Sequence, residues 1–191
     1  SDSLMVGPVG PDGSVWFHTP STVVRLFEDV WLRHTPEDGA IDGRVRSLVR
    51  SQDGSIWAVG AHQDMGAAAR FEGGRWQIYT EEDGVIDTPE RMLATRDGAL
   101  WVMGKHAGAS AVSRFGGTSW QRFDSEQGLG GVGGVGVGYE ASDGTVWFGA
   151  WGGKDMGAGL HRFDATARAG RRWTHSTAQV GNPAWLGAAG G

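Results

Sequence analysis

Several features that mark common protein classes are missing from this sequence of 191 residues. It has no cysteine, which excludes disulfide bonds and thiolate metal sites. No apolar stretch approaches the ~20 residues that a transmembrane helix needs. The net charge is −5 and no run of Lys or Arg is longer than two residues, so there is no basic stripe to neutralise phosphates. We therefore predict no nucleic-acid partner and no membrane segment in this piece of chain.

Glycine and tryptophan, by contrast, are abundant. The chain holds 34 glycines and 10 tryptophans. Glycine suits tight corners because it accepts positive φ without steric cost. Large flat side chains fill the space between packed sheets. This composition indicates an all-β protein with many turns.

A motif of the form Asp-Gly-x-x-Trp recurs four times along the chain. The spacings between successive copies are 41, 44 and 46 residues. A fixed period of this size is typical of stacked β-repeats. The copies are Asp12–Trp16, Asp53–Trp57, Asp97–Trp101 and Asp143–Trp147.

A second motif follows each copy of the first and consists of Arg, then Leu or Phe, then a turn, then Trp. Its Arg and Trp are six residues apart in three copies, and the fourth copy has five extra residues. The two motifs account for eight of the ten tryptophans, which favours a structural role over an exposed carbohydrate-stacking surface. The predicted core residues are Trp16, Trp57, Trp101, Trp147, Trp31, Trp76, Trp120 and Trp173.

Each repeat is expected to form a meander of four short strands, named a to d. Asp-Gly should form the a–b hairpin turn, in the type I′ geometry with positive φ at both central residues. One such meander cannot bury both of its faces, whereas radial stacking of several does. The predicted fold class is all-β: a partial, open β-propeller of four visible blades, each a four-stranded antiparallel meander. The expected blades are residues 3–36, 37–80, 81–123 and 124–175, with 176–191 beginning a truncated fifth repeat or forming a tail.

Three segments, 45–60, 70–76 and 79–86, resemble the two-component regulator propeller repeat. The resemblance implies a sensing domain of bacterial hybrid histidine kinases and related receptors, placed outside the cytoplasm, as in the periplasm. Such domains have larger propellers, so the chain is expected to be a fragment. Its expected partners are the remaining blades and the kinase part of a longer receptor chain, together with a saccharide or another small ligand.

The up-and-down path of the strands puts the b–c loops and the inter-blade d–a loops on one rim, where propellers commonly bind ligands. His62 and His106 each lie five residues after a repeated Trp and should occupy equivalent places on adjacent blades. We predict a polar ligand site here, although ordinary solvated loop polarity would also explain these residues. The candidate ligand-binding residues are His62, Asp64, Lys105, His106, Trp151, Lys154 and Asp155.

No set of residues marks a catalytic site, so we predict a binding protein with no catalytic residues, no cofactor and no metal. Two alternatives stay open. The first is a metal-dependent enzyme similar to the streptogramin lyase, which shares the Asp-Gly-x-x-Trp pattern and would use His62 and His106. The second is a protein-interaction scaffold that docks a partner on the same rim.

Overall fold

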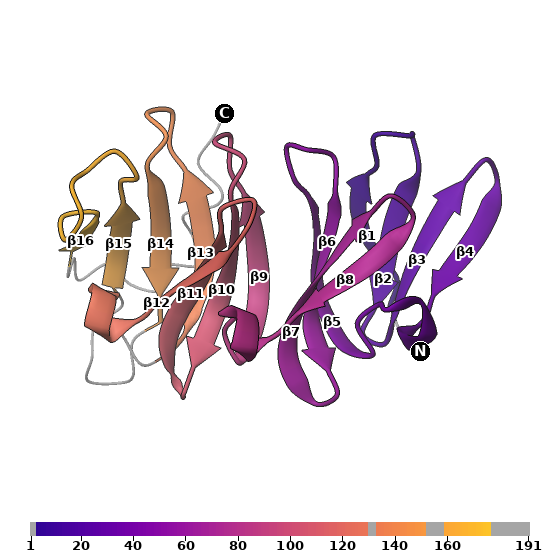
Figure 1. Cartoon of the computed structure of the whole chain (residues 1–191), viewed down its shortest axis with the longest axis horizontal. Helices are drawn as coiled ribbons and strands as arrows, with labels where there is room; N and C mark the ends of the chain where they lie inside the picture. Colours follow the sequence, from indigo (N-terminus) through magenta and orange to yellow (C-terminus); the bar gives the residue numbers. More distant parts are fainter. Residues whose placement is uncertain (1–2, 130–132, 152–158, 177–191) are drawn as a thin grey trace.

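A computed structural model describes residues 3–129, 133–151 and 159–176, which form four antiparallel sheets of four strands each (Figure 1). We call the sheets blades 1 to 4. Blade 1 is β1 (Met5–Val9), β2 (Val15–Thr19), β3 (Thr22–Phe27) and β4 (Val30–His34); blade 2 is β5 (Gly43–Arg50), β6 (Ile56–His62), β7 (Met65–Glu72) and β8 (Arg75–Tyr79). Blade 3 is β9 (Thr88–Ala94), β10 (Leu100–His106), β11 (Ala109–Phe115) and β12 (Trp120–Phe123); blade 4 is β13 (Val135–Glu140), β14 (Val146–Ala150), β15 (Gly159–Phe163) and β16 (Trp173–Ser176).

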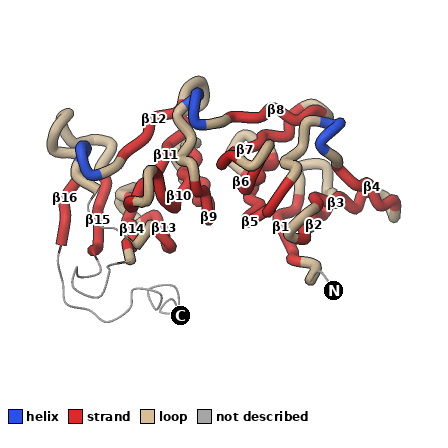
Figure 2. Tube along the Cα trace, turned by 90° about the horizontal axis from the view of Figure 1, so that it is seen from below, coloured by secondary structure: helices blue, strands red, loops and turns tan. Residues whose placement is uncertain are grey.

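The four blades stand side by side along an arc (Figure 2). The first strands, β1, β5, β9 and β13, contact one another in sequence and lie on the inner side of the arc, and the last strands lie on its outer side. Blades 1 and 4 are at opposite ends of the molecule (Figure 1). The fold is therefore a partial, open β-propeller, as the repeat predicts. Within the described ranges, no helix is long and apolar enough to cross a membrane.

The a–b turns differ from the expected type I′ geometry. In the a–b turn of blade 2, Gly54 has a positive φ, at 88°, and Asp53 does not. The Gly54 N–H donates to Ser51 O at 3.0 Å, so the turn spans residues 51–54 and has Gln52 and Asp53 at its centre instead of Asp53 and Gly54. Gly54 then forms a bulge after the turn. Asp53 is fixed instead by its carboxylate, which accepts the Ser55 N–H at 2.9 Å. The Asp-Gly pair thus ends a three-residue hairpin loop.

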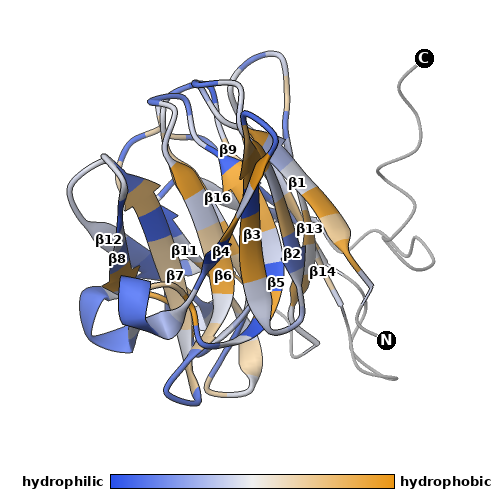
Figure 3. Ribbon diagram, turned by 90° about the vertical axis from the view of Figure 1, so that its right-hand side faces the viewer, coloured by the Kyte–Doolittle hydropathy of each residue, from blue (hydrophilic) through white to orange (hydrophobic). Residues whose placement is uncertain are grey.

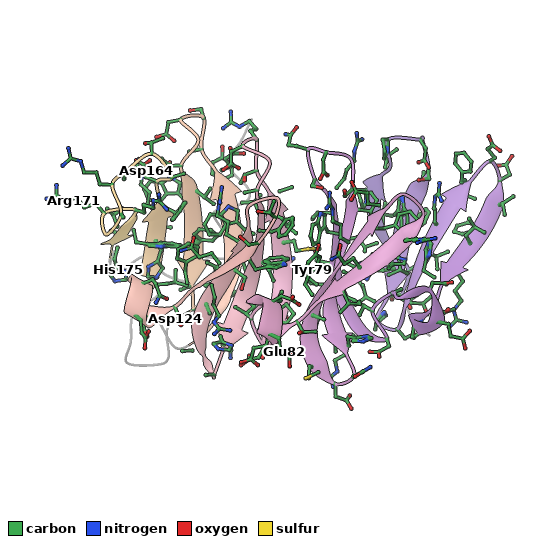
Figure 4. All side chains as sticks on the ribbon, viewed as in Figure 1. Tyr79, Glu82, Asp124, Asp164, Arg171 and His175 are labelled. Carbon is green, nitrogen blue, oxygen red and sulfur yellow. The ribbon has the colours of Figure 1, made fainter. Side chains whose placement is uncertain are left out.

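The core lies between the blades rather than within any one of them. Trp57 of blade 2 packs against Phe115 and Trp120 of blade 3, at ring-centroid distances of 5.1 and 5.8 Å. Tyr79, which stacks on Trp57 at 5.6 Å, belongs to the same junction and is labelled in Figure 4. Equivalent junctions form around Trp16 and Trp101, and all three b-strand tryptophans are 1% exposed.

Two of the eight tryptophans expected in the core need a correction. Trp31 is 56% exposed, whereas its repeat equivalents Trp76, Trp120 and Trp173 are half-buried in junctions. Trp147 is half-buried, although its own equivalents are almost fully buried. The physical reason is position: no described blade precedes blade 1 or follows blade 4, so each residue lacks the neighbour that would cover it.

Three short 3-10 turns connect successive blades: η1 (Pro36–Asp38), η2 (Glu81–Asp83) and η3 (Ser125–Gln127). The acidic residues that end the first two turns serve as caps, since Asp38 and Asp83 accept the backbone N–H groups of Thr35 and Thr80 at 2.9 and 2.8 Å. The Thr35 N–H bond lowers the pKa of Asp38 below its usual value. These carboxylates therefore hold the loops that lead each chain segment into the next blade.

Candidate functional site

The predicted ligand site lies on one rim of the molecule, which we call the loop rim. The loop rim consists of the b–c hairpins at 61–66 and 105–109, the inter-blade loops at 35–42, 80–87, 124–129 and 133–134, and Trp151. In blade 2, His62 Nδ1 lies 3.3 Å from Asp42 Oδ2. The same carboxylate accepts the Gln63 N–H, at 3.0 Å to Oδ1. Gln63 has φ 50°, a strained value for a residue with a side chain. Asp42 therefore ties the entry loop of blade 2 to the tip of its own b–c hairpin.

Blade 3 has the same arrangement of a histidine and an aspartate. His106 Nδ1 lies 3.3 Å from Asp87 Oδ2, and the Ala107 N–H donates to that oxygen at 2.6 Å. Glu81 is also near, with Oε1 at 3.8 Å from His106 Nε2. His62 and His106 therefore occupy equivalent positions on adjacent blades, as their spacing predicts, and both partner an aspartate that holds a hairpin in place.

The two His–Asp pairs are linked through a close backbone approach. The backbone of Gly66, on the b–c hairpin of blade 2, lies so close to Asp87 that a Cβ built on Gly66 would be 2.1 Å from the Asp87 carbonyl oxygen. Only glycine fits at this contact. Asp87 consequently contacts the hairpin of blade 2 with its backbone and the hairpin of blade 3 with its side chain.

The Lys105 side chain and the Trp151 backbone both contact Gly134 at the junction of blades 3 and 4. The aliphatic part of Lys105 lies against Gly134, whose hypothetical Cβ would be 3.0 Å from Lys105 Cε. Trp151 is tied to the same segment, because its N–H donates to Gly134 O and its carbonyl accepts the Gly133 N–H, both at 2.8 Å. Trp151 is 37% exposed, and its indole lies against Gly136. Lys105 and Trp151, from adjacent blades, therefore both contact the segment 133–136.

The remaining predicted site residues lie elsewhere or outside the described residues. Asp64 is at the exposed tip of the blade 2 hairpin, with φ 64°. Lys154 and Asp155 lie outside the described residues. Sequence reasoning missed Asp42 and Asp87, although the dipeptide Ile-Asp recurs at both positions, three residues after the glycine of each inter-blade turn.

The opposite rim, formed by the Asp-Gly hairpins, is rich in internal ion pairs. Arg70 Nη2 donates to Asp53 Oδ2 at 2.7 Å, and Arg114 makes the equivalent bond to Asp97 at 2.8 Å. Burial raises the pKa of Asp53, but hydrogen bonds from Ser51 and Ser55 and the Arg70 charge outweigh it, so the net pKa lies below the usual value. A cleft of about 440 Å³ between blades 1 and 2 has Asp12, Arg25, Asp53 and Glu72 in its lining. All four are already paired, since Asp12 binds Arg25 and the other two carboxylates bind Arg70.

A metal site would need three or more convergent ligands. In the described part of the chain, no group of three or more His, Cys, Asp or Glu side chains is placed to hold a metal ion. The two rim histidines face separate aspartates on separate blades, so the structure does not bring them to one point.

Comparison with known proteins supports the fold. No protein-family model and no curated protein matches the sequence. Among solved structures, a gluconolactonase from Xanthomonas campestris aligns with TM-score 0.59 and 12% identity over 93% of this chain and 62% of its own. A YCF48 protein bound to D1 peptide aligns with TM-score 0.55 and 19% identity over 92% of this chain and 54% of its own.

The extracellular domain of the BT4673 one-component system from B. thetaiotaomicron aligns with TM-score 0.46 and 10% identity, over 92% of this chain and 31% of its own. The chain thus spans less than two thirds of each of these proteins. At such identities the likeness concerns the fold alone. The class that fold and comparison define is the β-propeller.

Proposed function

We propose that this chain is a ligand-binding segment of a larger β-propeller receptor, and that the loop rim at the junction of blades 3 and 4 takes the ligand. The observation that carries the proposal is that Gly134 contacts both the Lys105 side chain and the backbone of Trp151, which come from adjacent blades. An exposed indole offers an apolar face, and a neighbouring ammonium offers hydrogen-bond donors. This pairing suits a small polar molecule with one apolar face, such as a saccharide.

The proposal is for binding without bond making or breaking. His62 and His106 each partner an aspartate that also holds a backbone N–H at a hairpin tip, which is a structural use of both groups. A metal-dependent lyase would need these histidines to converge on one ion. Their separate pairings favour the binding function over that alternative.

A sensing role follows from the resemblance of the repeat to the two-component regulator type. Because Asp87 contacts two hairpins and Gly134 contacts Lys105, a ligand on this rim touches residues that join adjacent blades. Ligand binding would favour one relative arrangement of the blades, and a receptor chain would respond to that shift. The receptor context and a site outside the cytoplasm are parts of this proposal.

Isothermal titration against a panel of neutral and acidic oligosaccharides tests the proposed site. We expect at least one saccharide to bind, and Trp151→Ala or Lys105→Ala to weaken its binding by about 10-fold or more. Met65→Ala is the matched control, since Met65 is an exposed apolar residue on the same rim but on the blade 2 hairpin. Absence of binding across the panel, or equal binding by all variants, would contradict the proposal.

A further inference from the structure

Each junction between blades has two unlike halves. The leading blade contributes its b-strand Trp, and the following blade contributes a c-strand Phe and a d-strand Trp. Trp16 contacts Phe71 and Trp76 at 4.9 and 5.9 Å, and Trp101 contacts Phe163 and Trp173 at 4.9 and 6.3 Å. The same geometry surrounds Trp57. The two sides of a junction are therefore different. The first blade has no leading blade before it, and the last described blade has no following blade after it.

Within the described residues, which end at Ser176, no blade follows blade 4, so its leading half has no partner there. Trp147 occupies the position of Trp57 and Trp101 but is only half-buried. Its cross-strand neighbour Tyr139 is 63% exposed. Arg162, paired with Trp147 on the other side, completes the same face. The described residues thus present an aromatic surface of the kind that every earlier blade buries against its successor.

Blade 1 carries the unmatched following half. Leu26 and Trp31, which pair across β3 and β4, correspond to Phe71 and Trp76. Val6 on β1 is 77% exposed, whereas the residues at its repeat position in blades 2 and 3, Leu48 and Met92, are 9% and 8% exposed. Figure 3 looks onto this end of the molecule and shows hydrophobic stretches on β1 and β3. The register places Val6, Val15, Phe17, Val24, Leu26 and Trp31 on this one face.

We propose that these two faces pair with each other between two copies of the chain, head to tail. The faces are the two halves of a junction that the chain itself builds three times, so they match in strand position. Each also keeps the repeated tryptophan of its half, Trp147 or Trp31. They lie at opposite ends of one molecule and cannot meet within it (Figure 1). Two copies joined through two identical junctions form a closed ring of eight blades, four from each copy, within the natural size range of propellers.

This inference goes beyond the proposed function, because it concerns the ends of the arc and not the loop rim. In a longer chain, the face of blade 1 would receive a further blade of the same repeat. In the 191-residue chain, a second copy supplies the blade that matches it.

Sedimentation of the 191-residue chain at about 1 to 100 μM tests the pairing. We expect a discrete species of twice the 20.3 kDa chain mass. Trp31→Glu should raise the dissociation constant on the order of 30-fold or more, because it places a charge at the centre of the junction. Met65→Glu, at a similarly exposed apolar residue, should leave it unchanged. Circular dichroism verifies that both variants are folded.

Cross-linking through introduced cysteines tests which faces of the two copies meet. The chain has no native cysteine, so each variant carries a single thiol. Within the chain, the Arg96 N–H donates to Glu140 of the next blade at 3.0 Å. The equivalent positions across the proposed junction are Ser142 and Val9, so mixed Ser142→Cys and Val9→Cys variants should be joined by a short thiol cross-linker. Val9→Cys with Glu82→Cys, on the opposite rim, should not. A monomer at all concentrations, an open-ended series of larger species, or equal cross-linking in both mixtures would overturn the proposal, whatever the saccharide titration shows.

Discussion

The guanidinium of Arg70 lies over the ring of Trp57, 5.7 Å from the ring centroid. Asp53 holds it there, with Oδ2 accepting from Nη2 at 2.7 Å. The same relationship recurs between Arg114 and Trp101, also at 5.7 Å. In blades 2 and 3, the hairpin aspartate therefore positions an arginine against the buried tryptophan of its own blade. The two motifs of the repeat are coupled in space through this arginine.

Removing this arginine should destabilise the fold. Arg70→Met keeps most of the aliphatic stem but removes the cation over Trp57 and leaves Asp53 without its ion-pair partner. We expect the free energy of unfolding to fall by about 1–3 kcal/mol, measured by urea denaturation. Arg75→Met is the control, at an exposed position on β8. A loss no larger than that of the control would show that the arginine does not stabilise the blade.

The stability of blade 1 should depend on pH through His34. Burial lowers the pKa of His34, which stacks on Trp16 at 5.0 Å. Because the folded state disfavours the charged form, stability is complete above the unfolded pKa and falls as the pH drops below it. We expect the melting temperature to decrease between about pH 7 and 5, and His34→Phe, which introduces the residue of blade 3 at this position, to flatten that decrease.

A separate decrease is expected at lower pH. The lowered pKa values of Asp53 and Asp97 mean that their stabilising effect is present above the unfolded value and is lost as the pH falls through the folded value, below about pH 4. The His34→Phe variant should retain this second decrease. If that variant keeps the decrease between about pH 7 and 5, the histidine is not the group responsible for it.

Gly66 should not tolerate a side chain. A Cβ at this position would lie 2.1 Å from the Asp87 carbonyl oxygen, so Gly66→Ala must displace the blade 3 entry loop. We expect a loss of about 1–3 kcal/mol in the free energy of unfolding. In Gly116→Ala, the new Cβ meets only the end of Arg114, at 3.3 Å, and that side chain can move. Equal losses in the two variants would argue against a tight contact between the blade 2 hairpin and Asp87.

Asp87→Asn should loosen the b–c hairpin of blade 3. The carboxylate accepts the Ala107 N–H at 2.6 Å, and Ala107 has φ 49°, a value that needs support. Neutralising the acceptor should cost about 1–2 kcal/mol and accelerate amide hydrogen exchange at residues 105–109. Asp64→Asn, at the exposed hairpin tip of blade 2, serves as control. Unchanged exchange in Asp87→Asn would remove the structural role assigned to this residue.

The sequence was sufficient to predict the repeat architecture, because the signal for each blade is local and occurs four times. The motif spacings predicted an open propeller of four blades with four strands in each blade, and the structure confirms that fold. The near-complete burial of Trp16, Trp57 and Trp101 follows from the same pattern, since each belongs to a repeat with a successor.

Burial at the ends could not be read from the motif itself. Trp31 and Trp147 have the same local sequence context as their buried equivalents, and their exposure depends on the presence of a neighbouring blade. The turn type was also missed, because the hydrogen bond of Gly54 to Ser51 selects a bulged three-residue loop. The roles of Asp42 and Asp87 depend on contacts about 20 residues away, which a motif search within a single loop does not detect.

The arc of blades, each touching only those beside it, also sets where the molecule should come apart. Within a single copy of the chain, blades 2 and 3 are held on two sides, whereas blades 1 and 4 are held on one. In such a one-dimensional array, opening proceeds inward from the termini. Heat or denaturant should therefore detach β1–β4 or β13–β16 first, while β6 and β10 keep their amide protons longest.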